Sequence, residues 1–162
     1  MSETARIIDQ LRQAFDGEPW SGPSLLTNLN GITAAQAAQH PVAAAHSIWE
    51  ITRHAGVWAE VVTRRIQQNA QLEISDAEDW PAPPENPTEA DWQQVLSELR
   101  AAHERLLQTA AAVADDSLDH TIGVFPDKAQ SPGSSAYVML HGVAQHYLYH
   151  AGQIALLRKA IS

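Results

Sequence analysis

The chain has 162 residues, which is enough for one domain with a sizeable hydrophobic core, and we predict a single domain over residues 1–162. Its 19 acidic and 10 basic residues give a formal charge of −9, and no Lys/Arg cluster offers the positive surface that nucleic acids bind. Cysteine is absent, which excludes disulfides, thiolate metal ligands and a cysteine nucleophile.

The N-terminal stretch, MSETARIIDQLRQAF, carries charges throughout and lacks the apolar run of a secretory signal. No later window approaches the ~18 apolar residues of a membrane span. We therefore expect a soluble, cytoplasmic protein without a membrane partner. The sequence predicts four helices: Glu3–Phe15, Val42–Asn69, one capped by Thr88 and reaching about Ala114, and one capped by Ser134 or Ser135 and reaching Ile161.

Three connections of different character separate these helices. The first is punctuated by Gly, Pro and Asn and has room for short helical turns. The second contains AEDWPAPPENP, whose four prolines form a linker that no helix crosses. The third, residues 115–135, is irregular and has enough Gly, Pro and Ser to act as a lid. Four amphipathic helices in one domain predict an all-α fold, a four-helix bundle.

The last predicted helix places two histidines on its apolar face. At about 100° per residue, His146 and His150 fall inside the apolar stripe, whereas His141 lies far outside it. The stripe itself consists of Met139, Val143, Ile154, Leu157 and Ile161. A lone buried histidine is usually a packed core residue, but two unpaired imidazoles would cost about 1–3 kcal/mol each. Because imidazoles at positions i and i+4 can reach one ion, the pair predicts a divalent metal site.

The second predicted helix offers a third ligand. His54 lies beside its apolar stripe, whereas His46 points almost directly away from that stripe. His54 is therefore the better candidate. Glu50 lies between the two and is a candidate catalytic base or a partner of a ligand; the alternative interpretation is a solvated helix charge.

Other histidines and tryptophans have weaker claims on the site. His103 falls within the apolar stripe of the third helix and could be a fourth ligand, a hydrogen-bond partner of a ligand, or a packed residue. His40 and His120 lie in predicted loops and receive no role. Trp49 and Trp58 are expected in the core or as walls of a pocket.

Three stretches, WSGPSLLTNLNGITAAQAA, HSIWEITRHAGVW and LHGVAQHYLYHAGQIALLRK, resemble the DinB/YfiT-like superfamily. The resemblance covers most of the chain, and its most specific part is H-x-x-x-H-x-G-Q-I. It implies a four-helix bundle in up-down-down-up order, with a metal ion, nickel or zinc, held by His54, His146 and His150. Because dimers are common in this superfamily, the resemblance also implies a homodimer.

Members of this superfamily include metal-dependent transferases that use low-molecular-weight thiols, and a thiol-dependent isomerase. Three imidazoles leave coordination positions open for a thiol or water. Because the chain lacks cysteine, the thiol would be a cosubstrate. The electrophile would bind between the bundle and residues 115–135, and the mouth of its pocket would lie near Tyr147, Trp58 and these residues. A metal-dependent hydrolase with Glu50 as base is equally compatible. The alternative is a non-catalytic, metal-stabilised binding or structural domain.

Overall fold

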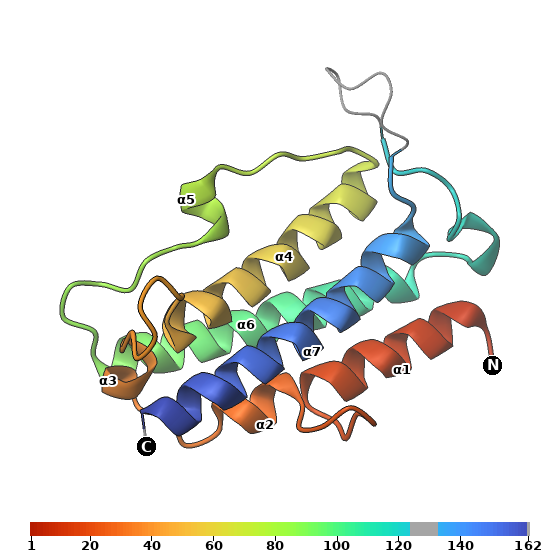
Figure 1. Ribbon diagram of the computed structural model, residues 1–162. Helices are drawn as coiled ribbons and strands as arrows, with labels where there is room; N and C mark the ends of the chain where they lie inside the picture. Colours follow the sequence, from red (N-terminus) through yellow and green to blue (C-terminus); the bar gives the residue numbers. More distant parts are fainter. Residues whose placement is uncertain (124–132, 162) are drawn as a thin grey trace.

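The computed structural model describes residues 1–123 and 133–161, and these residues form an all-helical structure, as predicted (Figure 1). The long helices among them are α1 (Glu3–Phe15), α4 (Ile48–Gln68), α6 (Glu89–Ala111) and α7 (Ala136–Ala160). The short elements are α2 (Leu25–Leu29), α3 (Ala34–Ala37), α5 (Asp76–Asp79) and the 3-10 turn η1 (Asp115–Ser117). Within this part of the chain, no helix combines the length and apolar character that crossing a bilayer requires.

Helix α4 begins six residues later than the predicted start at Val42, at Ile48. The Ser47 side chain accepts a hydrogen bond from the Glu50 backbone N–H, and the Glu50 carboxylate accepts one from the Ser47 backbone N–H. This reciprocal capping box satisfies N–H groups that a helix start otherwise leaves unpaired. Upstream, Ala44 has a φ of 62°, a left-handed conformation that an α-helix cannot contain. The prediction of a helix from Val42 was therefore wrong.

Other helix boundaries shift by a few residues. Helix α6 ends at Ala111 rather than near Ala114, and α7 is capped by the Ser135 side chain, one of the two predicted caps. Helix α5 occupies the start of the stretch predicted to be a linker, and it ends just before the first proline, Pro81. Residues 124–132, which belong to the predicted lid, lie outside the described residues.

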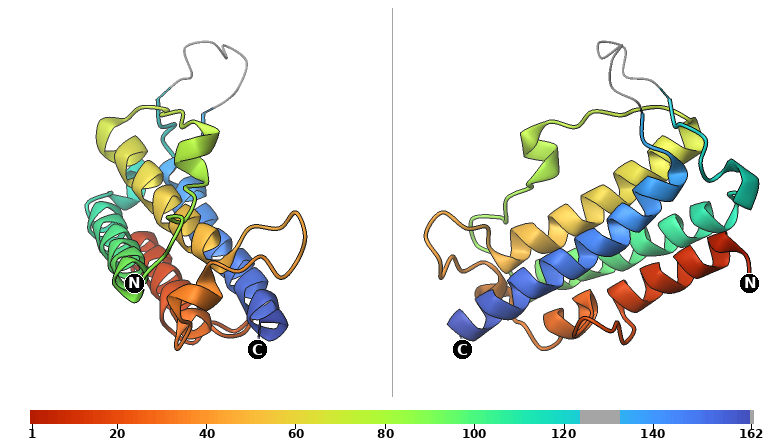
Figure 2. Two further views of the ribbon diagram at one scale, coloured as in Figure 1. Left: turned by 90° about the vertical axis from the view of Figure 1, so that its left-hand side faces the viewer. Right: turned by 45° about the vertical axis from the view of Figure 1, so that its right-hand side comes forward.

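The four long helices pack in a ring, in which α1 contacts α6 and α7, and α4 contacts the same two helices (Figure 2). Helices α1 and α7 run in one direction, and α4 and α6 run in the other (Figure 1). Because α4 and α6 are parallel neighbours, the chain must return along the bundle between them. Residues 69–88, which we call the strap, make this return along the outside of α4 and carry α5.

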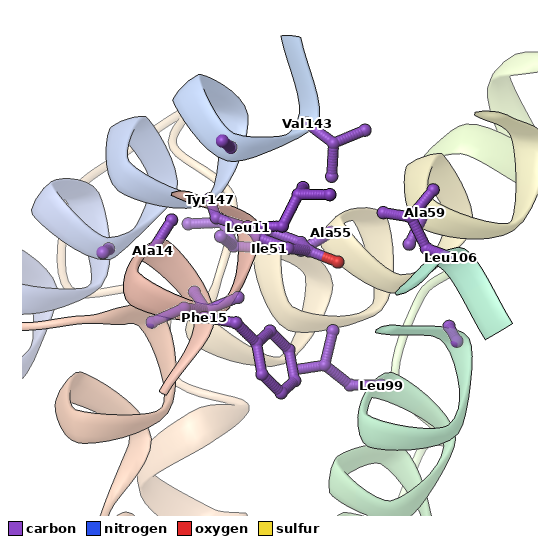
Figure 3. Close-up of a cluster of buried hydrophobic side chains, with 14 of the residues drawn as sticks. Leu11, Ala14, Phe15, Ile51, Ala55, Ala59, Leu99, Leu106, Val143 and Tyr147 are labelled. Atoms are coloured by element: carbon purple, nitrogen blue, oxygen red, sulfur yellow. The ribbon is translucent and has the colours of Figure 1, made fainter. Parts of the chain in front are cut away.

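The hydrophobic core fills the space between the long helices, and one part of it joins side chains from all four (Figure 3). Tyr147 of α7 is fully buried there, and its ring packs against Phe15 of α1 and His103 of α6. Trp49 is buried against Trp92, so it is a core residue. Because Tyr147 is fully buried, it does not itself line a pocket mouth, and the predicted position of the mouth near it stays a prediction.

Candidate metal centre

Three histidines from two neighbouring helices bring their ring nitrogens together. Helix α7 supplies His146 and His150, which are one turn apart, and α4 packs alongside and supplies His54. The Nε2 atom of His146 lies 3.0 Å from that of His54 and 2.8 Å from that of His150. His54 and His150 are buried, and His146 is partly buried. The three predicted ligands therefore form one cluster that could hold a metal ion.

The opposite ring nitrogens of two of these histidines are hydrogen-bonded. The Nδ1 atom of His54 lies 2.8 Å from Oδ1 of Asp79 and 3.0 Å from the Asp79 main-chain oxygen. The Nδ1 atom of His150 lies 2.6 Å from Oε1 of Gln153. Because these oxygens only accept hydrogen bonds, they place the proton of each neutral ring on Nδ1. The Nε2 lone pairs of His54 and His150 then point into the cluster.

Burial keeps the cluster uncharged. It lowers the pKa of His146 to about 3 and that of His150 to about 4, and the neighbouring histidines contribute further to both shifts. Burial also lowers the pKa of His54, although Asp79 opposes the shift. All three imidazoles are therefore neutral near pH 7, which is the form that binds metal ions.

The donor set fits a divalent ion. Two nitrogen ligands in tetrahedral zinc geometry are separated by about 3.3 Å, so the observed nitrogens would need to spread by roughly 0.3–0.5 Å. Without an ion, the one proton that a neutral His146 can place on Nε2 would be shared between the Nε2 lone pairs of His54 and His150. His146 Nδ1 is moreover buried and has no hydrogen-bond partner among the described residues. The three Nε2 atoms nevertheless converge closely enough that a divalent ion could bind between them.

Two tryptophans surround the cluster. The Trp80 ring stacks on His54 with centroids 3.7 Å apart and planes 5° from parallel, and His46 stacks on its other face at 3.6 Å. Trp58 meets the rings of His54 and His146 edge-on at 6.4 and 6.3 Å. Trp58 thus contacts two of the three histidine rings, and its role as the wall of a pocket stays a prediction. The part played by Trp80 was not predicted.

Sequence and structure comparisons agree with this architecture. The family model described as the DinB superfamily matches residues 22–154, which is most of the chain. The chain belongs to the DinB superfamily. A crystal structure of a conserved protein from Enterococcus faecalis shares the fold, with a TM-score of 0.71 and 19% identity over 99% of this chain and 98% of that one. No curated protein matches the sequence significantly.

In this DinB-superfamily chain, Glu50 is occupied by contacts at the start of α4. Its Oε2 atom accepts hydrogen bonds from the Ser47 backbone N–H at 2.7 Å and from His40 Nε2 at 2.9 Å. Burial alone would raise the pKa of Glu50, but the hydrogen bonds from Ser47 and His40 outweigh it and lower the pKa. His40, predicted to have no role, thus supports the cap. The base role of Glu50 stays a prediction.

His103 lies in a different part of this DinB fold, between α1, α6 and α7. Its ring stacks on Phe15 with centroids 3.8 Å apart, and the ring of Tyr147 is 5.7 Å away. Among the described residues it does not belong to the cluster that could hold a metal ion. His103 was predicted to be a fourth ligand, a hydrogen-bond partner of a ligand or a packed residue. The structure shows the last of these, a packed residue.

A pocket of about 360 Å³ adjoins the cluster of this DinB-superfamily protein. His150 and Gln153 of α7 form one side of it, and His46, Trp80 and Tyr149 complete its aromatic rim. The remaining lining residues are apolar: Val42, Ala45, Ile51, Leu156 and Leu157. The site thus has an apolar chamber beside one of its ligands.

Sequence reasoning missed three residues of this DinB site. Gln153 had a readable signal, because it follows His150 by three residues on the same helix. Asp79 and Trp80 had none, because they lie in a non-periodic connection whose path depends on the packing of α4 against α6.

Proposed function

We propose that this protein is a metal-dependent enzyme with the up-down-down-up four-helix bundle of the DinB/YfiT-like superfamily. Its favoured reaction is the transfer of a low-molecular-weight thiol to an electrophile. One observation carries the proposal: among the described residues, the group able to hold an ion contains three histidines and no fourth ligand. Catalytic zinc sites have three protein ligands and an open position, whereas structural sites are closed by four.

The residues around the cluster have distinct tasks in this proposal. His54, His146 and His150 bind the ion, for which nickel or zinc is proposed, and Asp79 and Gln153 orient two of the rings. When bound, a divalent ion supplies positive charge. This charge lowers the pKa of a coordinated thiol or water toward neutral values. Trp58 and Trp80 limit the access of bulk water to the rings.

The contacts of Glu50 favour thiol transfer over hydrolysis. A hydrolase would need a general base for water, and Glu50 is the residue predicted for it. Its Oε2 atom already accepts hydrogen bonds from Ser47 and His40, which hold it at the helix start. A thiol needs no such base if the ion itself lowers the pKa of the thiol. The chain has no cysteine, so the thiol must be a cosubstrate.

The electrophile is proposed to be an apolar molecule that occupies the chamber of about 360 Å³ beside His150. Its apolar and aromatic lining suits a planar or branched carbon group better than a charged one. A homodimer is also predicted, from the family resemblance alone. The competing function, a metal-stabilised domain without turnover, requires a fourth ligand that closes the site.

Cobalt substitution tests the open position directly. The visible spectrum of the cobalt-loaded protein should change when a small thiol is added, and the change should saturate with thiol concentration. A spectrum that stays constant over a wide concentration range would show that the position is closed. In that case the structural function would replace the transferase. An apolar electrophile added to the thiol-loaded protein should then yield a conjugate, which mass spectrometry detects.

A further inference from the structure

Polar contacts fasten the strap to α4, and three of them meet on one residue, Asp79. The Trp58 Nε1–H group donates to Oδ1 of Asp79 at 2.8 Å, and His54 Nδ1 lies 2.8 Å from the same oxygen. Elsewhere along the strap, the guanidinium groups of Arg65 and Arg53 donate to the main-chain oxygens of Leu72 and Ala82. Asp79 is therefore the point at which the strap and the histidine cluster meet.

Asp79 controls both the proton and the orientation of His54. A carboxylate facing Nδ1 fixes the proton on that atom and directs the Nε2 lone pair toward His146. A carboxylate also makes an imidazole a stronger electron donor than a neutral acceptor does. Because Trp58 donates to the same oxygen, the Asp79 side chain has one preferred position. His150, in contrast, has only the neutral amide of Gln153.

The neighbouring residue fixes the plane of the same ring. Trp80 covers one face of His54, and His46 covers the far face of Trp80, so that three rings lie in one stack. Rotation of the His54 ring would break this stack as well as the bond to Asp79. Two consecutive strap residues thus hold one ligand of the cluster in both tautomer and orientation.

We propose that Asp79 is a positioning residue for the metal ion, and that metal binding and closure of the strap over α4 stabilise each other. The proposal rests on the proposed metal-binding function. If the closed strap raises the affinity for the ion, the ion must favour the closed strap by the same factor, because the coupling of two equilibria is reciprocal. The cluster is therefore a site of α4, α7 and the strap together.

Zinc affinity, measured by competition with a chromophoric chelator, tests the role of Asp79. Asp79→Ala should weaken binding by roughly 10–100-fold, the range for residues that orient a metal ligand. The effect should lie near the lower end because the main-chain oxygen of residue 79 still faces His54. Asp79→Asn, which keeps an acceptor oxygen without the charge, should lie between Asp79→Ala and the wild type.

Asp76→Asn is the matched control, because it removes the same charge from an exposed position of the same short helix. A spectroscopic signature separates positioning from folding: in the zinc-loaded protein, the Nδ1–H proton resonance of His54 should move upfield in Asp79→Asn and stay in place in Asp76→Asn. Equal affinity of Asp79→Ala and Asp76→Asn, or an unmoved resonance in Asp79→Asn, would overturn the proposal while leaving the metal site intact. A wild type that binds no zinc would overturn both.

Limited proteolysis of the wild type tests the coupling without any variant. The strap contains Glu73, Glu78 and Glu85, which a protease that cleaves after acidic residues can attack, and Asp16, exposed at the end of α1, is a reference outside it. Zinc should slow cleavage in the strap and leave cleavage at Asp16 unchanged. If zinc binds but strap cleavage proceeds at the same rate with and without it, the coupling does not exist.

Discussion

The molecule contains two buried histidine environments that share their burial but differ in what surrounds the rings. In the cluster, His54, His146 and His150 bring three Nε2 atoms together, and two of the rings have hydrogen-bond acceptors at Nδ1. In the core, His103 stacks on the Phe15 ring, and its Nδ1 atom has no partner among the described residues.

Burial and titration do not separate these environments, because burial lowers the pKa of both His103 and His150 to about 4. What separates them is convergence: three Nε2 atoms meet at one point, and acceptors hold the Nδ1 atoms of two of these rings. A buried histidine is thus evidence for a metal site only when its neighbours supply further nitrogens and orienting oxygens.

Removing a cluster ligand should have the largest effect on metal binding. His146→Ala and His150→Ala each leave two imidazoles, too few for a stable site, so stoichiometric binding should be lost. The loss should exceed the roughly 10–100-fold expected at Asp79. Metal content per chain after dialysis measures it, with His103→Leu as a control that should keep its metal. If both alanine variants keep their full metal content, these histidines do not form a metal site. The two histidine environments would then not differ in metal binding.

The pH dependence of stability should identify His103 as a packed, neutral residue. Its pKa is lowered by burial from 6.5 to about 4, so between these values the unfolded chain binds a proton that the native protein does not. The free energy of unfolding therefore falls as pH drops from about 6.5 to about 4. His103→Leu removes this contribution, and the decrease between pH 7 and pH 5 should become smaller by about 1–2 kcal/mol.

Urea unfolding of metal-free protein at the two pH values measures this change. The cluster histidines titrate in both wild type and variant, so their contribution cancels in the difference. His120→Leu, at an exposed histidine, is the matched control and should keep the wild-type dependence. An equal pH dependence of His103→Leu and the wild type would show that His103 is hydrated or already charged in the native protein.

The sequence predicted the cluster because helical periodicity is a local property. The side-chain directions of His146 and His150 follow from 3.6 residues per turn, and no knowledge of the rest of the fold is needed. The same projection placed His54 beside the apolar stripe of its helix, and the structure buries it against α7. The all-helical fold was predictable for the same reason.

The start of α4 was readable but was missed. Ser47 and Glu50 have the spacing of a capping box, which favours a helix start at Ile48 over the predicted start at Val42. Asp79 was not readable, because a proline-rich strap has no period from which a direction could be projected. Its position depends on the parallel packing of α4 and α6, which is a tertiary property. The local half of the site was therefore predictable and the long-range half was not.

The smallest effect on metal binding is expected at His46, which belongs to neither environment. Its side chain is 45% exposed and stacks on the face of Trp80 that points away from His54. His46→Ala should keep one ion per chain and change zinc affinity by less than about threefold, well below the 10–100-fold range for a residue that contacts a ligand. His141→Ala, on the other side of α7 from the stripe, should behave in the same way. Titration calorimetry of both variants measures stoichiometry and affinity together. A loss at His46 as large as that of His150→Ala would mean that His46 binds the ion, and the boundary of the cluster would have to be moved outward to include it.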